Sequence, residues 1–148
     1  MSGISGRIEG HEHVLPVRVY YEDTDAAGIA YYANYLKFAE RGRTEMLRLA
    51  GIQQSEVAQR HGVAFAVRDC KVDYRQPARL DDLVEVRSRL TGLRGASADM
   101  AQVISRDGAV LARLDLRIAC IGPGARPARF PAALRTALER YCQTAEQR

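Results

Sequence analysis

A single amphipathic helix between about Tyr32 and Gly51 constrains this chain more than any other feature of its sequence. Apolar or small residues recur there at spacings of three and four, the period of one helical face, at Tyr35, Phe38, Ala39, Gly42, Met46 and Leu49. Such a stripe must be buried against another element. Gly42 within it predicts a close crossing over a sheet, and Gly51 followed by Ile52 is typical of a helix end.

An acidic turn precedes this helix. It contains Glu22, Asp23 and Asp25, and small residues follow up to Gly28. A helix N-terminus leaves backbone N–H groups unpaired and carries partial positive charge. The turn can therefore bring a carboxylate and backbone donors into one small space, which is what acyl transfer requires.

The remaining elements indicate an α+β fold. Alternating apolar residues predict strands at 14–21, 63–74, 83–90, 97–105 and 110–120, and polar residues 53–62 suit a further helical turn. A phase change predicts a bulge near Arg68 and Asp69, and Asp107-Gly108 marks a tight hairpin. Pro131 can start a short helix. One strand, a long helix and a run of antiparallel strands predict a helix packed on an antiparallel sheet.

Composition and length exclude several classes of protein. The 148 residues suit one domain, here 14–148 after a flexible N-terminal segment 1–13, and the net charge is a mild +4. No apolar run approaches the ~18 residues of a membrane span, and no signal peptide is visible. We expect a cytoplasmic protein, with peripheral association at the inner membrane as an open alternative. Three scattered cysteines argue against disulfides or zinc.

Taken alone, the acidic turn has several interpretations. Acidic loop residues are ordinarily solvated turn formers or caps. A phosphatase-like D-x-D pattern at Asp23 and Asp25 lacks its following Thr, because Ala27 stands there. A calcium loop starting at Asp23 fails because Asn34 occupies the position of the bidentate Glu. We therefore expect no metal site, and no nucleic-acid-binding pattern is present.

The motif-bearing segments carry a resemblance to a known family. They read VRVYYEDTDAAGIAYYANYLKFAERGRTEML at 17–47, VAFAVRDCKVDYRQPARLDD at 63–82 and LRGAS at 93–97. Together they closely resemble the hotdog-fold acyl-CoA thioesterases of the 4-hydroxybenzoyl-CoA thioesterase superfamily. More narrowly, the chain is similar to the bacterial subgroup associated with the Tol-Pal cell-envelope system. The resemblance covers nearly everything from Val17 to Cys120.

This resemblance implies a long helix wrapped by an antiparallel sheet. It also implies a homo-oligomer, in which protomers pair edge to edge into a dimer or tetramer with active sites at the subunit interface. Asp25 matches the catalytic carboxylate, and Tyr32 matches the position whose backbone N–H binds the thioester oxygen. Gly28 allows close approach, and we expect Tyr35 to contact the substrate. The Tol-Pal-associated subgroup usually has His at the position of Tyr32, whereas aryl-CoA members can have Tyr, which leaves the acyl preference open.

The implied activity is hydrolysis of an acyl-CoA to free acid and CoA, with Asp25 as nucleophile or general base. No metal or bound cofactor is expected, since CoA is part of the substrate. Arg75 and Arg94 are candidate contacts to the CoA phosphates, although each also suits solvated surface. One alternative is a non-catalytic protein that binds acyl-CoA or acyl carrier protein. A hydroxyacyl dehydratase is disfavoured, because no His occurs between His13 and His61.

Overall fold

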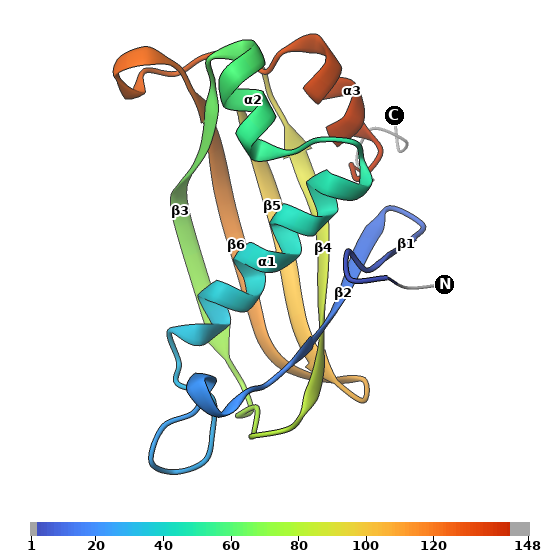
Figure 1. The fold of residues 1–148 in the computed structure, drawn as a ribbon, viewed down its shortest axis with the longest axis vertical. Coiled ribbons are helices and arrows are strands. Elements are labelled where there is room, and N and C mark those ends of the chain that lie inside the picture. Colours follow the sequence, from blue (N-terminus) through green and yellow to red (C-terminus); the bar gives the residue numbers. More distant parts are fainter. Residues whose placement is uncertain (1–2, 143–148) are drawn as a thin grey trace.

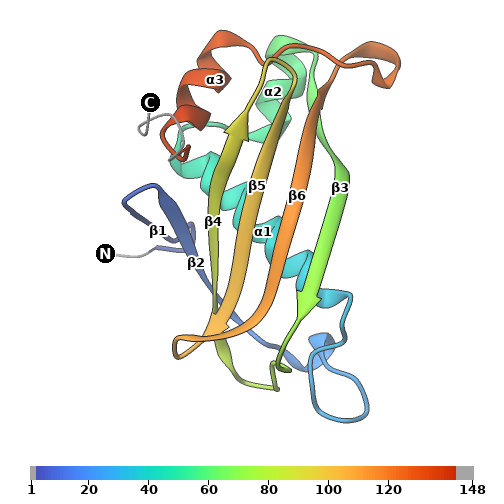
Figure 2. The same ribbon diagram turned by 180° about the vertical axis from the view of Figure 1, so that it is seen from behind.

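The computed structural model describes residues 3–142, which form one antiparallel sheet with a long helix across one of its faces (Figure 1). The strands are β1 (Arg7–Glu9), β2 (Glu12–Arg18), β3 (Ala64–Tyr74), β4 (Leu83–Leu93), β5 (Ser97–Arg106) and β6 (Ala109–Ile121). The helices are α1 (Asn34–Leu49), α2 (Gln54–His61) and α3 (Ala132–Glu139), with 3-10 turns at Tyr21–Asp23 and Pro123–Ala125. The strand order is β1-β2-β4-β5-β6-β3. Figure 2 shows the opposite sheet face, which no helix of the described residues covers.

Helix α1 ends in the motif that the sequence predicts. Gly51 has a φ of +84°, in the left-handed region that favours glycine. The N–H of Ile52 donates to the Leu47 carbonyl at 2.9 Å, and the N–H of Gly51 donates to the Arg48 carbonyl at 3.0 Å. This double closure is the Schellman motif, and it satisfies carbonyls that the helix end would otherwise leave unpaired.

The close crossing predicted at Gly42 is confirmed. A Cβ atom at Gly42 would lie 2.7 Å from Val86 Cγ1 and 3.3 Å from Ser88 Oγ, both on β4. The Gln102 side chain lies at the same crossing, and its Nε2 donates to the Ala39 carbonyl and to Ser88 Oγ, each at 2.9 Å. The helix therefore approaches the sheet closely, and the buried polar groups at the crossing are paired.

After residue 60 the structure contains β3, β4, β5 and β6, which are the four strands that the sequence patterns predict there. The register of β3 against β6 shifts between Val67 and Asp69, which confirms the predicted bulge. The hairpin at Asp107-Gly108 is also confirmed, with both residues at positive φ. Strand β4 continues to Leu93, beyond the predicted end at 90, because a register shift between Leu90 and Gly92 lets pairing with β5 resume.

Regular structure begins earlier than the sequence analysis predicts. The expected flexible segment 1–13 contains β1 and the start of β2, which form a hairpin with Arg7 opposite Val14. His13 is fully buried there. Apolar alternation does not reveal this hairpin because the segment is polar: Arg7 pairs with Glu85 of β4, and Glu9 and Glu12 pair with Arg87 of β4. Residues 1–2 and 143–148 of the expected segments lie outside the described residues.

Strand β3 is an edge of the sheet. It pairs with β6 on one side only, and most of its residues are exposed, including Val67 at 47% and Tyr74 at 45%. An edge strand presents unpaired backbone N–H and C=O groups that another chain can pair with. Along its eleven residues, β3 therefore offers a surface for strand addition.

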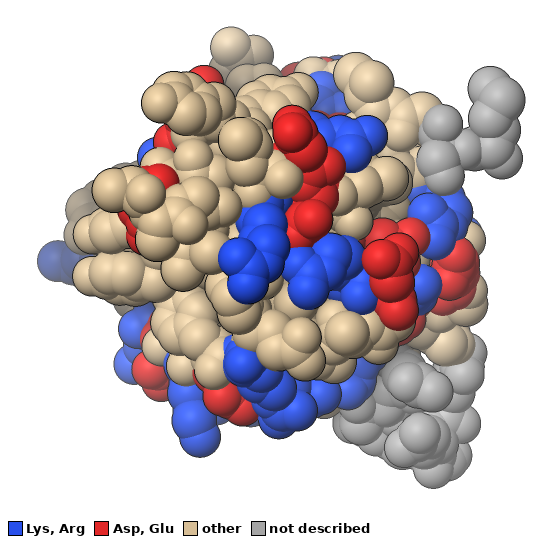
Figure 3. Space-filling model, turned by 90° about the horizontal axis from the view of Figure 1, so that it is seen from below, with Lys and Arg blue, Asp and Glu red and all other residues tan. Residues whose placement is uncertain are grey.

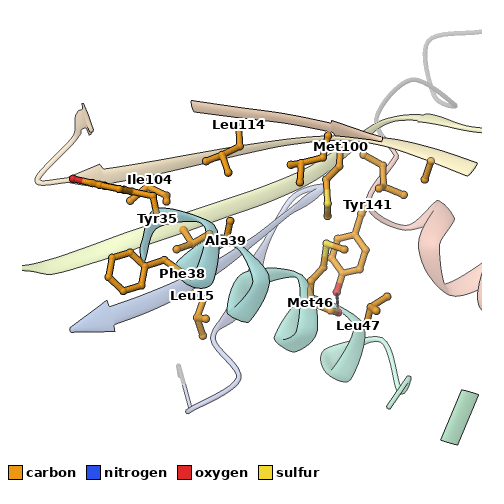
Figure 4. Packing of buried hydrophobic residues seen from close by; sticks show 14 of the residues in the cluster. Leu15, Tyr35, Phe38, Ala39, Met46, Leu47, Met100, Ile104, Leu114 and Tyr141 are labelled. Carbon is orange, nitrogen blue, oxygen red and sulfur yellow. Dashed lines mark hydrogen bonds between the residues drawn. The ribbon is translucent and has the colours of Figure 1, made fainter. Parts of the chain in front are cut away.

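The core fills the space between α1 and the sheet (Figure 4). Ala39 of α1 faces Ile104 and Leu114, and Met46 faces Met100 near α3, whereas Phe38 lies on the side of Leu15. Tyr141 is also buried there, and its hydroxyl donates to the Met46 carbonyl at 2.7 Å. The predicted helix at Pro131 is confirmed as α3, which closes this end of the core. Residues 3–142 include no helix with the length and apolar character of a membrane span.

Candidate active site

The turn before α1 holds Asp25 by backbone hydrogen bonds. The N–H of Asp25 donates to the Ile29 carbonyl at 2.9 Å, and the N–H of Gly28 donates to the Asp25 carbonyl at 3.0 Å. Gly28 has a φ of +76°, and a Cβ atom at that position would meet nothing within 4 Å. Glycine is therefore favoured here by backbone conformation, and the space in front of the turn is open.

The aspartates at positions 23 and 25 have different surroundings. Asp23 is buried, and its Oδ2 accepts the Tyr20 N–H at 2.8 Å. Its carbonyl accepts the Tyr31 N–H at 2.8 Å and Asn34 Nδ2 at 2.7 Å. Asp25 is exposed, and only its Oδ1 is engaged within residues 3–142, by the Ala27 N–H at 2.8 Å. Asp23 thus holds the turn together, whereas one oxygen of the Asp25 carboxylate has no hydrogen-bond partner within residues 3–142.

A segment far along the chain supports the turn. The Ala30 N–H donates to the Ala78 carbonyl at 2.8 Å, and the Leu80 N–H donates to the Gly28 carbonyl at 3.3 Å. The buried Tyr35 completes this contact, because its hydroxyl accepts the Ala78 N–H at 2.8 Å. Segment 77–82 therefore fixes the position of the turn relative to α1.

The N-terminus of α1 offers free backbone donors beside the turn. The N–H groups of Tyr32 and Ala33 donate no hydrogen bond to the part of the chain that the structure describes, and no side chain caps the helix. The Tyr74 hydroxyl donates to the Tyr32 carbonyl at 3.0 Å. Burial, and then the neighbouring Tyr32, raise the pKa of Tyr74, so its phenol remains a donor at neutral pH. These N–H groups are suited to stabilise a negative oxygen.

The predicted site residues fall into two groups. Asp25, Gly28, Tyr32 and Tyr35 come together at one end of α1. Figure 3 views this end, where a broad uncharged area adjoins a band of mixed charges. Tyr32 is 62% exposed, whereas Tyr35 is 3% exposed and points into the core. Tyr74 was not among the predicted site residues, although it is two positions from Val72, which packs against the core, and therefore lies on the same face of β3.

The two predicted arginines lie apart from each other. Arg75 follows β3 near the turn, is exposed, and pairs with Asp73 at 3.1 Å. Arg94 follows β4, whose other end at Leu83 pairs with Arg18 beside the turn. Arg94 pairs with Asp99 at 2.5 Å, and this contact raises the pKa of its guanidinium. Within one protomer, Arg94 is therefore at the far end of the sheet from Asp25 (Figure 1).

A cavity of about 250 Å³ lies under the C-terminal half of α1. It is bounded by the start of β3, by β5 and by α3, and its walls include Met46, Phe65, Ala98, Met100, Phe130 and Leu138. Glu40, Arg43 and Gln54 are its polar residues. Arg43 Nη1 donates to Gln102 Oε1 at 3.0 Å, and burial lowers the pKa of Arg43. Within residues 3–142, no cluster of His, Cys, Asp and Glu could hold a metal ion.

An antiparallel sheet wrapped on one long helix, with a carboxylate turn at the helix start, defines a hotdog-fold thioesterase. The chain belongs to the thioesterase-like superfamily, whose family model matches residues 19–138. The expected resemblance is thereby confirmed.

Relatives within this family are similar over most of the chain. The acyl-CoA thioester hydrolase YbgC of Escherichia coli O6:H1 is 46% identical over 110 residues, 73% of this chain and 81% of that protein. The acyl-CoA thioesterase YbgC of Haemophilus influenzae is 39% identical over 124 residues, 83% of this chain and 91% of that protein. A probable thioesterase from Bartonella henselae is 35% identical, with a TM-score of 0.77, covering 81% of this chain and 99% of that one.

Proposed function

We propose that this protein hydrolyses acyl-CoA thioesters to the free acid and CoA, using the carboxylate of Asp25. The observation that carries the proposal is the turn itself, which presents a free carboxylate oxygen next to the unpaired N–H groups of Tyr32 and Ala33. The names of the Escherichia coli and Haemophilus influenzae relatives, which are acyl-CoA thioester hydrolases, support the same substrate class.

In the reaction, the carbonyl oxygen of the thioester accepts the N–H of Tyr32. As a nucleophile, the Asp25 carboxylate attacks the carbonyl carbon, CoA leaves as the thiolate, and water hydrolyses the mixed anhydride. As a general base, Asp25 instead takes a proton from the water that attacks the carbonyl. In both routes negative charge develops on the same oxygen, and the N–H groups at the start of α1 stabilise it. Neither route uses a metal or a bound cofactor.

We also propose that two protomers pair through their β3 edges. The exposed strand supports this pair. Two such pairs would then form the tetramer that the family resemblance implies. The acyl group arrives on CoA, and acyl carrier protein remains an alternative donor of the same thioester.

The experiment compares hydrolysis of a panel of acyl-CoAs by the wild type and Asp25→Asn, with products separated by chromatography. Asparagine keeps an oxygen that accepts the Ala27 N–H, so the turn should stay folded. We expect kcat to fall by about 10²-fold or more, since the reacting carboxylate is lost. Glu22→Gln, which changes an exposed carboxylate of the same segment, is the matched control and should keep full activity. Binding of CoA esters without turnover by the wild type would contradict the proposal.

A further inference from the structure

The peptide groups just before α1 are held in two different ways. A peptide group is planar, so the carbonyl of one residue and the N–H of the next are fixed together and point in opposite directions. The Tyr31 carbonyl accepts the Asn34 N–H at 2.8 Å, and this fixes the N–H of Tyr32. Within residues 3–142, the only backbone N–H that the Tyr32 carbonyl accepts is that of Tyr35, at 3.4 Å, which is long for a hydrogen bond. The N–H of Ala33 therefore has little support from the backbone.

The hydroxyl of Tyr74 supplies the missing support. It lies 3.0 Å from the Tyr32 carbonyl oxygen, and the phenol is the donor because a carbonyl can only accept. A group that fixes this carbonyl also fixes the N–H on the other side of the same peptide group, which belongs to Ala33. A donor on the carbonyl also polarises the amide, so the N–H becomes a stronger donor. Tyr74 thus acts on the Ala33 N–H through the peptide group.

Tyr74 is itself held by several neighbours. Its backbone pairs with Ala112 of β6. Its ring meets those of Tyr32 and Tyr35 edge-on, with ring centroids 6.2 Å and 5.4 Å apart. Tyr35 is buried, and its hydroxyl accepts the Ala78 N–H at 2.8 Å. The Tyr74 hydroxyl therefore donates from a defined position, although 45% of the residue is exposed.

This support acts on a donor that hydrolysis needs. As the thioester carbonyl is attacked, negative charge grows on its oxygen, and donors that are already oriented stabilise this charge without reorganisation. We propose that Tyr74 is a positioning residue for the reaction: its hydroxyl holds the peptide group so that the Ala33 N–H joins the Tyr32 N–H on the thioester oxygen. This inference rests on the proposed hydrolysis, and it assigns Tyr74 a task beyond the packing of the fold.

The first test measures kcat and KM of Tyr74→Phe with the panel of acyl-CoAs. Phenylalanine keeps the ring with its edge-on contacts and removes only the hydroxyl. Loss of a whole oxyanion donor lowers kcat by about 10²–10³-fold; here the donor remains and only its support is lost, so we expect kcat to fall by about tenfold. KM should change by less than about twofold, because the oriented donor acts chiefly on the transition state.

Tyr141→Phe is the matched control. The Tyr141 hydroxyl also donates to a backbone carbonyl of α1, that of Met46, at 2.7 Å, but near the other end of the helix (Figure 4). Each variant loses one hydrogen bond from a phenol, so both should unfold at a lower temperature than the wild type. Only Tyr74→Phe should lose kcat when both are assayed well below their unfolding temperatures.

The second test observes the thioester carbonyl itself. Asp25→Asn should bind an acyl-CoA without hydrolysing it, so the stretching frequency of an isotopically labelled thioester carbonyl can be followed by infrared difference spectroscopy. Hydrogen-bond donors polarise the carbonyl and lower this frequency. We expect the frequency to be lowered less in the double variant Asp25→Asn, Tyr74→Phe than in Asp25→Asn alone. Adding Tyr141→Phe to Asp25→Asn should leave it unchanged.

The outcomes separate this inference from the proposed function. If the wild type hydrolyses no acyl-CoA, the proposed function is wrong and this inference fails with it. If the wild type is active but Tyr74→Phe keeps its kcat, or Tyr141→Phe lowers kcat as much, the Tyr74 hydroxyl serves the fold alone, while the proposed function stands. A carbonyl frequency that Tyr74→Phe leaves unchanged would likewise overturn the role of Tyr74.

Discussion

Asp23 and Asp25 are two positions apart, and the fold gives them different tasks. The chain buries Asp23 among backbone donors and leaves Asp25 in solvent with one oxygen free. The sequence could place both in a turn, but it could not rank them from spacing alone, because the distinction depends on contacts with Tyr20 and Tyr31. Only the family resemblance selected Asp25.

His13 is a buried residue whose titration should affect folding. Burial lowers the pKa of His13, while its hydrogen bond to the Ser5 carbonyl and the charge of Glu45 act the other way. Nε2 lies 2.7 Å from that carbonyl, and Nδ1 is buried without a partner in the described residues. The native state therefore favours a neutral ring, with Nε2 donating.

This predicts a loss of stability in mild acid. Because the unfolded chain takes up the proton at the ordinary pKa of 6.5 and the native ring does so only at lower pH, stability falls as pH drops below 6.5. We expect the unfolding temperature of His13→Gln to fall less between about pH 7 and pH 5 than that of the wild type. His61→Gln, at an exposed position, is the control and should follow the wild type. Equal pH dependence of wild type and His13→Gln would contradict the prediction.

At the scale of elements, the crossing of α1 over β4 depends on one missing side chain. Gly42→Ala raises helix propensity by about 1 kcal/mol. The new Cβ atom would nevertheless lie 2.7 Å from Val86 Cγ1, an overpacking that typically costs about 1–3 kcal/mol. We expect a net loss of about 1 kcal/mol in the free energy of unfolding, measured by urea denaturation.

A double-mutant cycle checks the cause of that loss. Val86→Ala removes the methyl group that the new Cβ atom meets, so Gly42→Ala with Val86→Ala should be less destabilised than the sum of the single changes. Additive losses in the free energy of unfolding would show that the contact between the new Cβ atom and Val86 is not the cause of the destabilisation.

Periodicity predicts elements well where each has one buried face. Helix α1, its end at Gly51, strand β6 and the bulge in β3 all follow from apolar spacing and glycine placement. The hairpin of β1 and β2 does not, because it pairs charged residues and buries His13. The support of the turn by segment 77–82 is also invisible in local patterns, since it joins backbone groups about 50 residues apart.

At the scale of the whole molecule, activity should depend on the β3 edge. Cys70 is exposed near the middle of β3, and a lysine at an edge strand opposes pairing with another chain. We expect Cys70→Lys to lower the molar mass seen by light scattering toward that of one protomer, and to reduce hydrolysis although Asp25 is intact. Ala133→Lys, on the exposed side of α3, controls for the added charge. A Cys70→Lys protein of unchanged mass and activity would contradict the role of this edge.

The support of the turn by segment 77–82 also has a consequence for the order of synthesis. The carbonyl of Ala78 that fixes Ala30, and the Tyr74 hydroxyl that fixes Tyr32, both lie well downstream of Asp25 in the chain. A nascent chain that has emerged only as far as α2 lacks both partners. Closing so long a loop requires the later strands to be in place. Asp25 is therefore among the early residues to leave the ribosome, yet its turn is held in place only after segment 77–82 has followed.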